Sequence, residues 1–92
     1  MLLPPRSVRW EKQFSDEMAR LEPDPERADE LVEGIDWVLA RLPTYGTNIA
    51  GTNVWVISIR EVAKHRTLVV FYTYSNIEIF LLSVIPTELI RQ

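Results

Sequence analysis

Apolar and polar residues follow two different periods along this chain, first a helical one and then a strand-like one. Between residues 11 and 42, apolar side chains recur every three or four positions, which predicts two helices. Between residues 54 and 85, runs rich in valine, isoleucine and aromatic residues predict three β-strands in close succession. The pattern therefore predicts an α+β domain whose helices precede most of its strands.

The first half of the chain predicts a short strand and then a pair of helices. Ser7–Trp10 is the predicted strand, and two prolines before it favour an extended lead-in. Residues 11–21 form the first predicted helix. Asp24 suits the N-cap of the second helix, and Pro25 suits its first turn. That helix has a continuous apolar stripe, formed by Ala28, Leu31, Val32, Ile35, Val38, Leu39 and Leu42.

Three strands are expected after a loop at residues 44–53. They are Val54–Arg60, Thr67–Tyr74 and Ile77–Ile85, and their close spacing predicts an antiparallel meander. A tight turn at Ser75-Asn76 joins the last two, because asparagine tolerates the left-handed backbone conformation. The expected fold is a short strand, a two-helix hairpin and a three-stranded meander.

The last two predicted strands are apolar on both faces. In the strand at residues 67–74, for example, Val70 and Tyr72 point to one side, and Val69 and Phe71 point to the other. The helix pair covers one face only, and monomers rarely expose a large apolar surface. We therefore expect a partner protein, or a second copy of this chain, to cover the sheet. The predicted contact residues are Trp37, Val56, Val70, Tyr72 and Leu81.

Composition limits the chain to one domain, residues 1–92, with 47% hydrophobic residues to form a core. No apolar run has the length of a membrane span, and neither a secretory signal nor a cysteine is present, so we expect a cytoplasmic protein. The net charge is −3. Residues 11–36 hold ten acids and three bases, whereas residues 37–92 hold three acids and five bases. This balance disfavours a domain that mainly binds phosphate backbones.

The chemically suggestive residues gather between the first two strands of the meander. Arg60, Lys64 and Arg66 form either a charged turn or a patch that binds anions. His65, the only histidine, is either a solvated loop residue or an acid–base group. Trp37, opposite the apolar stripe, is a partly exposed aromatic, an aromatic covered by the first helix, or a partner-binding anchor. The sequence has no zinc-protease motif, carboxylate–histidine ligand set or phosphate-binding glycine loop, so it predicts no metal and no cofactor.

The order of these elements resembles the RelE/ParE superfamily of bacterial type II toxins. The local sequence is similar too, with LARLP ending the second helix and VWVISIRE, LVVFYTY and IEIFLLSVI forming the strands. The resemblance covers roughly Val8–Ile85. It implies a cytoplasmic toxin that a co-encoded antitoxin holds inactive by wrapping around it and lying on its sheet.

The superfamily has branches with different targets. RelE-like members cleave mRNA on the ribosome without a metal, using basic and aromatic side chains. Arg60 lies at the matching strand end, with Lys64 and Arg66 in the adjoining turn, but Ser83 stands where that branch tends to place an arginine. Residues 86–92 also lack a tyrosine or histidine. ParE-like members instead bind DNA gyrase, which is the reading we favour; a RelE-type endoribonuclease and a non-toxic protein-binding member are the alternatives.

Overall fold

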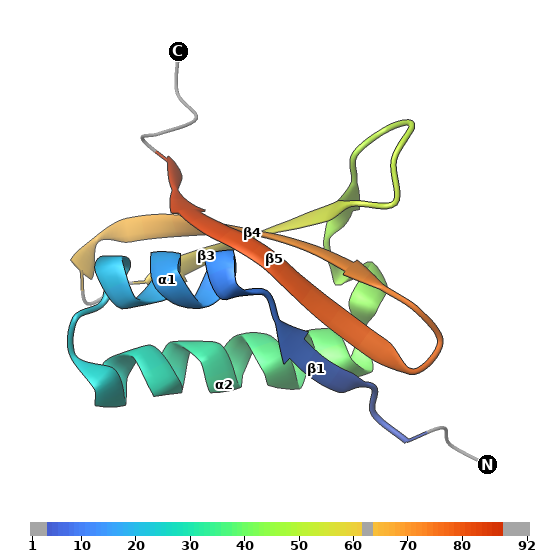
Figure 1. The fold of residues 1–92 in the computed structure, drawn as a ribbon. Coiled ribbons are helices and arrows are strands. Elements are labelled where there is room, and N and C mark those ends of the chain that lie inside the picture. The colour runs from blue at the N-terminus through green and yellow to red at the C-terminus, as the bar shows by residue number, and fades with distance from the viewer. Residues whose placement is uncertain (1–3, 62–63, 88–92) are drawn as a thin grey trace.

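A computed structural model of the chain describes residues 4–61 and 64–87 (Figure 1). The α+β class expected from the sequence is confirmed. In chain order the elements are β1 (Ser7–Trp10), α1 (Lys12–Leu21), α2 (Pro25–Arg41), the 3-10 helix η1 (Pro43–Tyr45), β2 (Thr47–Asn48), β3 (Trp55–Glu61), β4 (Arg66–Tyr74) and β5 (Glu78–Pro86).

The described strands form one five-stranded sheet in the order β1-β5-β4-β3-β2. β3, β4 and β5 are antiparallel neighbours, and β1 lies parallel to β5. The expected strand count is therefore corrected, because β2 lies in the segment predicted to be a loop. β2 pairs with Trp55 and Val56 of β3. Two residues are too few to show an alternating pattern, so β2 was not visible in the sequence.

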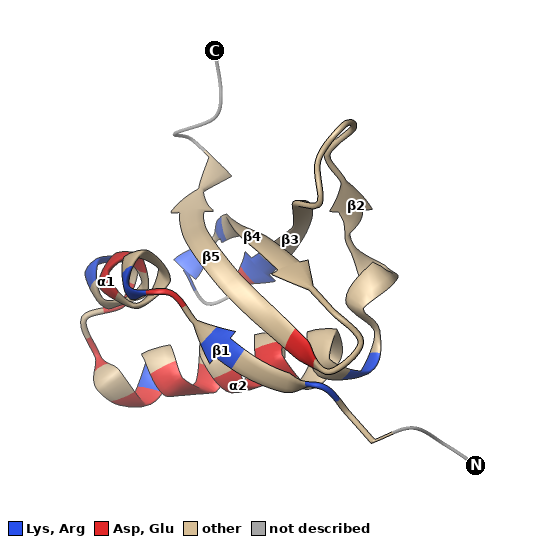
Figure 2. Cartoon of the chain, turned by 45° about the vertical axis from the view of Figure 1, so that its right-hand side comes forward, with Lys and Arg blue, Asp and Glu red and all other residues tan. Residues whose placement is uncertain are grey.

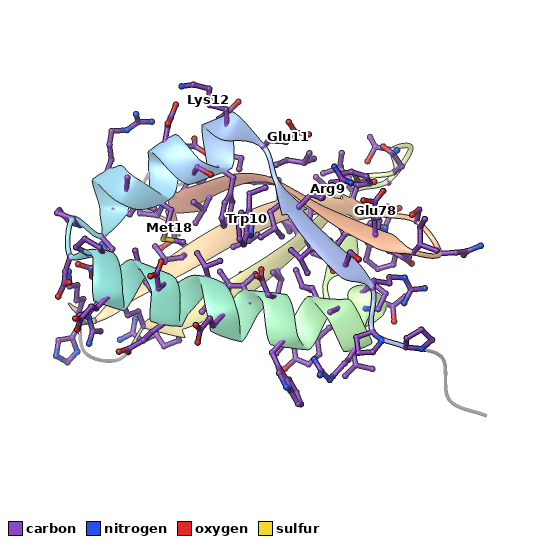
Figure 3. The ribbon with its side chains drawn as sticks, turned by 60° about the horizontal axis from the view of Figure 1, so that its bottom comes forward. Arg9, Trp10, Glu11, Lys12, Met18 and Glu78 are labelled. Atoms are coloured by element: carbon purple, nitrogen blue, oxygen red, sulfur yellow. The ribbon has the colours of Figure 1, made fainter. Side chains whose placement is uncertain are left out.

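The two helices pack side by side on one face of the sheet (Figures 1 and 3). α2 begins as predicted, since the side chain of Asp24 accepts a hydrogen bond from the amide of Glu26 at 3.1 Å and Pro25 follows the cap. Apolar side chains from both layers meet between the helices and the sheet. The buried cluster consists of Phe14, Met18, Ile35, Leu39, Ile57, Leu68, Val70, Tyr72, Ile79, Leu81 and Val84.

A β-bulge changes which residues of β5 face the helices. The register between β4 and β5 shifts between Phe71 and Tyr72, so that Leu82 is the extra residue of β5. As a result, Leu81 and Val84 are both buried in the core. Simple alternation would place these two side chains on opposite faces, and the bulge is the reason that both lie in the core.

The hydroxyl of Tyr72 connects η1 to the centre of the sheet. It donates a hydrogen bond to the carbonyl of Pro43 at 2.6 Å and accepts one from the amide of Gly46 at 3.1 Å. Burial raises the pKa of the Tyr72 hydroxyl above its usual value, so it stays protonated and able to donate. Gly46 passes so close to the carbonyl of Val56 that a Cβ atom there would lie 2.5 Å from the carbonyl oxygen.

Candidate functional site

The face of the sheet that points away from the helices is the main candidate site. We call it the open face, and the strand register places on it Ser7, Arg9, Thr47, Val56, Ser58, Arg60, Thr67, Val69, Phe71, Thr73, Glu78, Phe80, Ser83 and Ile85. The core lies on the opposite face, between the sheet and the helices. Within residues 4–61 and 64–87, no helix covers the open face (Figure 1).

The open face is apolar at its centre and polar at its border. Val69 is buried by its neighbours, whereas Phe71, Phe80 and Ile85 keep part of their surface exposed. Ser58, Thr67 and Thr73 add hydroxyl groups, and Arg9 and Glu78 form an ion pair at the border. Many other charged residues lie on α1 and α2 (Figure 2). An apolar centre with a polar border is typical of a protein-binding surface. It lacks the dense positive charge that nucleic acid backbones require.

The structure distributes the predicted strand contacts over both faces. Val56 lies on the open face, and it is partly exposed. Val70, Tyr72 and Leu81 are 0% exposed, because they point toward the helices and fill the core. These three side chains cannot contact a partner while the domain remains folded, and they are corrected to core residues. The open-face residues that sequence reasoning left out are chiefly Phe71, Phe80 and Ile85, whose side chains lie on the opposite side of the strands from the core.

Trp37 lies on α2, away from the open face. Its side chain is 62% exposed. The guanidinium group of Arg41, one helical turn later, lies over the indole at 4.3 Å from the ring centroid. This cation–π contact fixes the orientation of the ring at the surface. A role for Trp37 as a partner anchor stays a prediction, separate from the open face.

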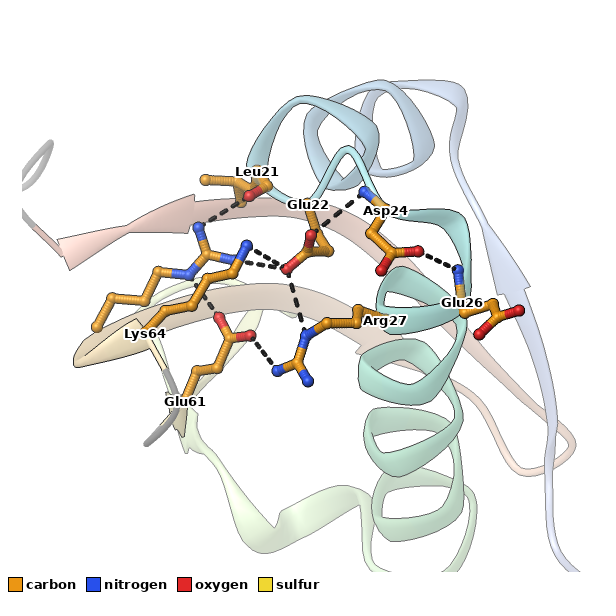
Figure 4. A network of polar contacts seen from close by, with 8 residues as sticks. Leu21, Glu22, Asp24, Glu26, Arg27, Glu61 and Lys64 are labelled. Carbon is orange, nitrogen blue, oxygen red and sulfur yellow. Dashed lines mark hydrogen bonds and ion pairs between the residues drawn. The ribbon is translucent and has the colours of Figure 1, made fainter.

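Five charged residues form an ionic cluster at one end of the domain (Figure 4). Its two carboxylates, Glu22 after α1 and Glu61 at the end of β3, are almost completely buried. Lys64 Nζ lies 2.6 Å from Glu22 Oε1, and Arg66 Nε lies 2.5 Å from Glu61 Oε1. Arg27 Nη2 lies 3.3 Å from Glu61 Oε2. The cluster joins the helix connection to the ends of β3 and β4.

The cluster favours the charged form of the Glu22 carboxylate. The ion pair with Lys64 is the main cause that lowers the pKa of Glu22 below its usual value, and burial opposes this shift. A guanidinium N–H of Arg66 also donates to the carbonyl of Leu21 at 2.8 Å, which satisfies the end of α1. The cluster therefore has a clear structural role, and sequence reasoning missed it because Lys64 and Arg66 lie far from Glu22 in the sequence.

The four candidate catalytic residues are not brought together. Lys64 and Arg66 point into the ionic cluster, where they are paired with carboxylates. Arg60 is exposed on the open face, on the other side of the sheet. His65 is exposed in the turn and has a left-handed backbone conformation with φ of 51°. This geometry provides no shared pocket in which the four side chains could act on one substrate.

A groove of about 340 Å³ separates α1 from α2. Trp10, Phe14, Met18 and Val32 contribute to its apolar lining, and Figure 3 shows Trp10 and Met18 directed into the space between the helices. The indole N–H of Trp10 donates to the carboxylate of Asp36 at 3.4 Å. Burial raises the pKa of that carboxyl group above its usual value. The groove has no nucleophile and base in contact, so we do not regard it as an active site.

Among the described residues, no group of three or more His, Asp or Glu side chains is arranged to bind a metal ion. No helix in the described part of the chain is long and apolar enough to cross a membrane. Neither the models of known protein families nor the curated proteins gave a match to this chain.

Proposed function

We propose that this chain is the toxin component of a bacterial toxin–antitoxin pair and that it acts by binding other proteins. An antitoxin encoded by the neighbouring gene covers the open face and holds the toxin inactive. DNA gyrase is the target, as the resemblance to ParE-like toxins implies.

The open face is the observation that supports this proposal most. Phe71, Phe80 and Ile85 place an apolar band on a face that neither helix covers. Monomeric proteins rarely expose a continuous apolar surface of this kind unless it binds something. The polar border around the band favours a partner that binds and dissociates as a separately folded chain.

Side-chain chemistry gives less support to the RelE-type endoribonuclease. A ribonuclease without a metal needs free cations to stabilise the charge that develops on phosphate. Lys64 and Arg66 are already paired in the ionic cluster, and Ser83 donates a hydrogen bond to Glu17 at 2.7 Å. Arg60 is left as an exposed cation with no ion pair among the described residues. A non-toxic, protein-binding member of the superfamily would use the same open face. Growth of cells that express the chain alone distinguishes it from a toxin.

The proposal is tested by expressing the chain in bacteria, first alone and then with the neighbouring open reading frame. We expect growth arrest with the chain alone and normal growth with both. The purified chain should inhibit supercoiling by DNA gyrase, and arrested cells should accumulate double-strand breaks. Codon-positioned mRNA cuts, seen by primer extension, would favour the endoribonuclease. Normal growth despite abundant, soluble chain would contradict the toxin proposal and favour the non-toxic binding protein.

A matched pair of variants tests the role of the open face. Phe71→Glu places a charge in the centre of the apolar band, so we expect growth arrest to persist and rescue by the antitoxin to be lost. Ile77→Glu places the same charge on an exposed apolar residue beside the β4–β5 turn, and rescue should remain. Circular dichroism and thermal unfolding verify that both variants fold. Equal rescue of the two variants would exclude the open face as the antitoxin site.

A further inference from the structure

Strand β3 is only partly paired along its outer edge. β2 pairs with Trp55 and Val56 of β3 and ends there, because the chain before it turns away into η1 at Gly46. Within residues 4–61 and 64–87, no strand pairs with the outer edge of β3 at Ile57–Glu61. Five of the seven residues of β3 therefore lie along an edge that has no strand partner in the described part of the chain.

The direction of the main-chain groups along this edge follows from one hydrogen bond. The carbonyl of Val54 accepts from the amide of Ile49 at 2.9 Å, so it points away from β4. Main-chain groups of an antiparallel strand alternate in direction with a period of two residues. The amides and carbonyls of Val56, Ser58 and Arg60 consequently point the same way. Those of Ser58 and Arg60 lie beyond the end of β2, at the free part of the edge.

Natural sheets usually protect such an edge with proline, a bulge or several charges. The free stretch contains no proline, and its register with β4 is regular. Of its two charged residues, Glu61 is buried in the ionic cluster, which leaves Arg60 as the exposed one. Arg60 makes no ion pair among the described residues. The edge thus offers unpaired main-chain groups beside a single accessible positive charge.

We propose that an extended segment of the partner polypeptide adds to β3 as a further strand along Ile57–Glu61, in line with β2. Main-chain hydrogen bonds to Ser58 and Arg60 provide the affinity, as in other cases of strand addition. An acidic side chain opposite Arg60 and apolar side chains beside Ile57 and Ile59 provide the specificity. This inference depends on the proposed function, since it specifies how the antitoxin segment would bind.

Charge favours an acidic partner over a second copy of this chain. Two copies that paired along the same edge would bring Arg60 of one copy near Arg60 of the other on the same face of the joined sheets. Like charges at neighbouring cross-strand positions are destabilising. A partner segment with glutamate or aspartate at that position would gain an attraction instead.

The test uses amide hydrogen exchange of the whole isotope-labelled chain with a short synthetic peptide. The peptide alternates threonine and valine and has one glutamate in place of a central threonine. In the free chain, the amides of Ile57 and Ile59 should exchange slowly, because they face β4, and those of Ser58 and Arg60 should exchange fast. We expect the peptide to slow exchange at Ser58 and Arg60 and to leave Ile57 and Ile59 unchanged.

A control peptide with lysine in place of the glutamate should bind about fivefold more weakly, the size of a cross-strand charge pair. The variant Arg60→Glu should reverse this preference. Ser58→Pro removes one edge donor without removing a bond to β4, and it should lose the protection at Arg60. The amide NMR spectrum of Ser58→Pro shows whether this variant folds. If it does not fold, the peptide preference of Arg60→Glu still tests the proposal.

Two outcomes would overturn the proposal. One is peptide binding that leaves exchange at Ser58 and Arg60 fast. The other is slow exchange at these amides that depends on the concentration of the chain alone, which would identify a second copy as the occupant. The measurement does not involve toxicity. Growth arrest and rescue without edge protection would therefore contradict strand addition alone, whereas edge protection without growth arrest would contradict only the toxin proposal.

Discussion

The carboxylate of Glu17 in α1 accepts a hydrogen bond from the hydroxyl of Ser83 in β5 at 2.7 Å. The same carboxylate oxygen accepts from the amide of Val84 at 3.0 Å. β1 pairs with β5 only as far as Leu81, so the carboxylate takes the place of a strand partner for the next residues. A single helical side chain thus satisfies the edge of the sheet where β1 has ended.

This arrangement predicts that Glu17→Ala destabilises the domain. The amide of buried Val84 would lose its partner, and an unsatisfied buried donor costs about 1–3 kcal/mol. Chemical denaturation measures the change in the free energy of unfolding. Glu30→Ala, an exposed glutamate of α2, serves as the control and should change stability little. Equal stability of the two variants would mean that the Glu17 bonds contribute nothing.

Tyr72→Phe should also destabilise the domain, by about 1–3 kcal/mol. The substitution removes one hydroxyl group from the core and leaves the carbonyl of Pro43 and the amide of Gly46 without their partner. The control is Tyr45→Phe, because Tyr45 is largely exposed and removal of its hydroxyl leaves no buried group unpaired. Thermal unfolding of both variants provides the comparison, and a Tyr72→Phe variant as stable as its control would contradict the expectation.

Two glycines should respond to alanine in opposite directions. At Gly46 a Cβ atom would lie 2.5 Å from the carbonyl oxygen of Val56, so Gly46→Ala forces the backbone apart and should cost about 1–3 kcal/mol. At Gly34, on the exposed side of α2, no atom lies within 4 Å of the added Cβ. Gly34→Ala should therefore stabilise the helix by up to about 1 kcal/mol. Urea titration of the two variants tests both signs, and a stabilising Gly46→Ala would show that η1 is not held against β3.

The ionic cluster predicts a loss of stability in acid. The pKa of Glu22 is lower in the folded state than its usual value near 4.5, because Lys64 pairs with the carboxylate. Its contribution is therefore fully present above the unfolded pKa, and it disappears as the pH falls through the lower folded pKa.

The matched variants for this prediction are Glu22→Gln and Glu30→Gln. We expect Glu22→Gln to lose part of the dependence of the unfolding free energy on pH below about 4.5. Glu30→Gln should show the same dependence of the unfolding free energy on pH as the original chain, since Glu30 is exposed on α2. Parallel pH curves for the original chain and Glu22→Gln would show that the pair with Lys64 does not stabilise the fold.

The elements that depend on local sequence were predictable. The 3.6-residue stripe located α2, and Asp24 with Pro25 gave its start, since capping involves only neighbouring residues. The three long strands lie within one or two residues of the expected ranges, because their alternation and apolar content extend over seven to nine positions. The sequence of β4, which is apolar on both faces, also predicted that the sheet has a second apolar face.

The tertiary structure decided which side chains are available at the surface. The bulge at Leu82 reverses the facing of the residues after it, and a register shift depends on the neighbouring strand rather than on the sequence of β5. Lys64 and Arg66 appeared free in the sequence, but folding places them against Glu22 and Glu61. Sequence by itself determined the two long helices, the longer strands and most of their apolar faces, because these depend on local periodicity. Only the packed structure decided which charges are paired and which sheet edge is open, because these depend on contacts between residues far apart in the chain.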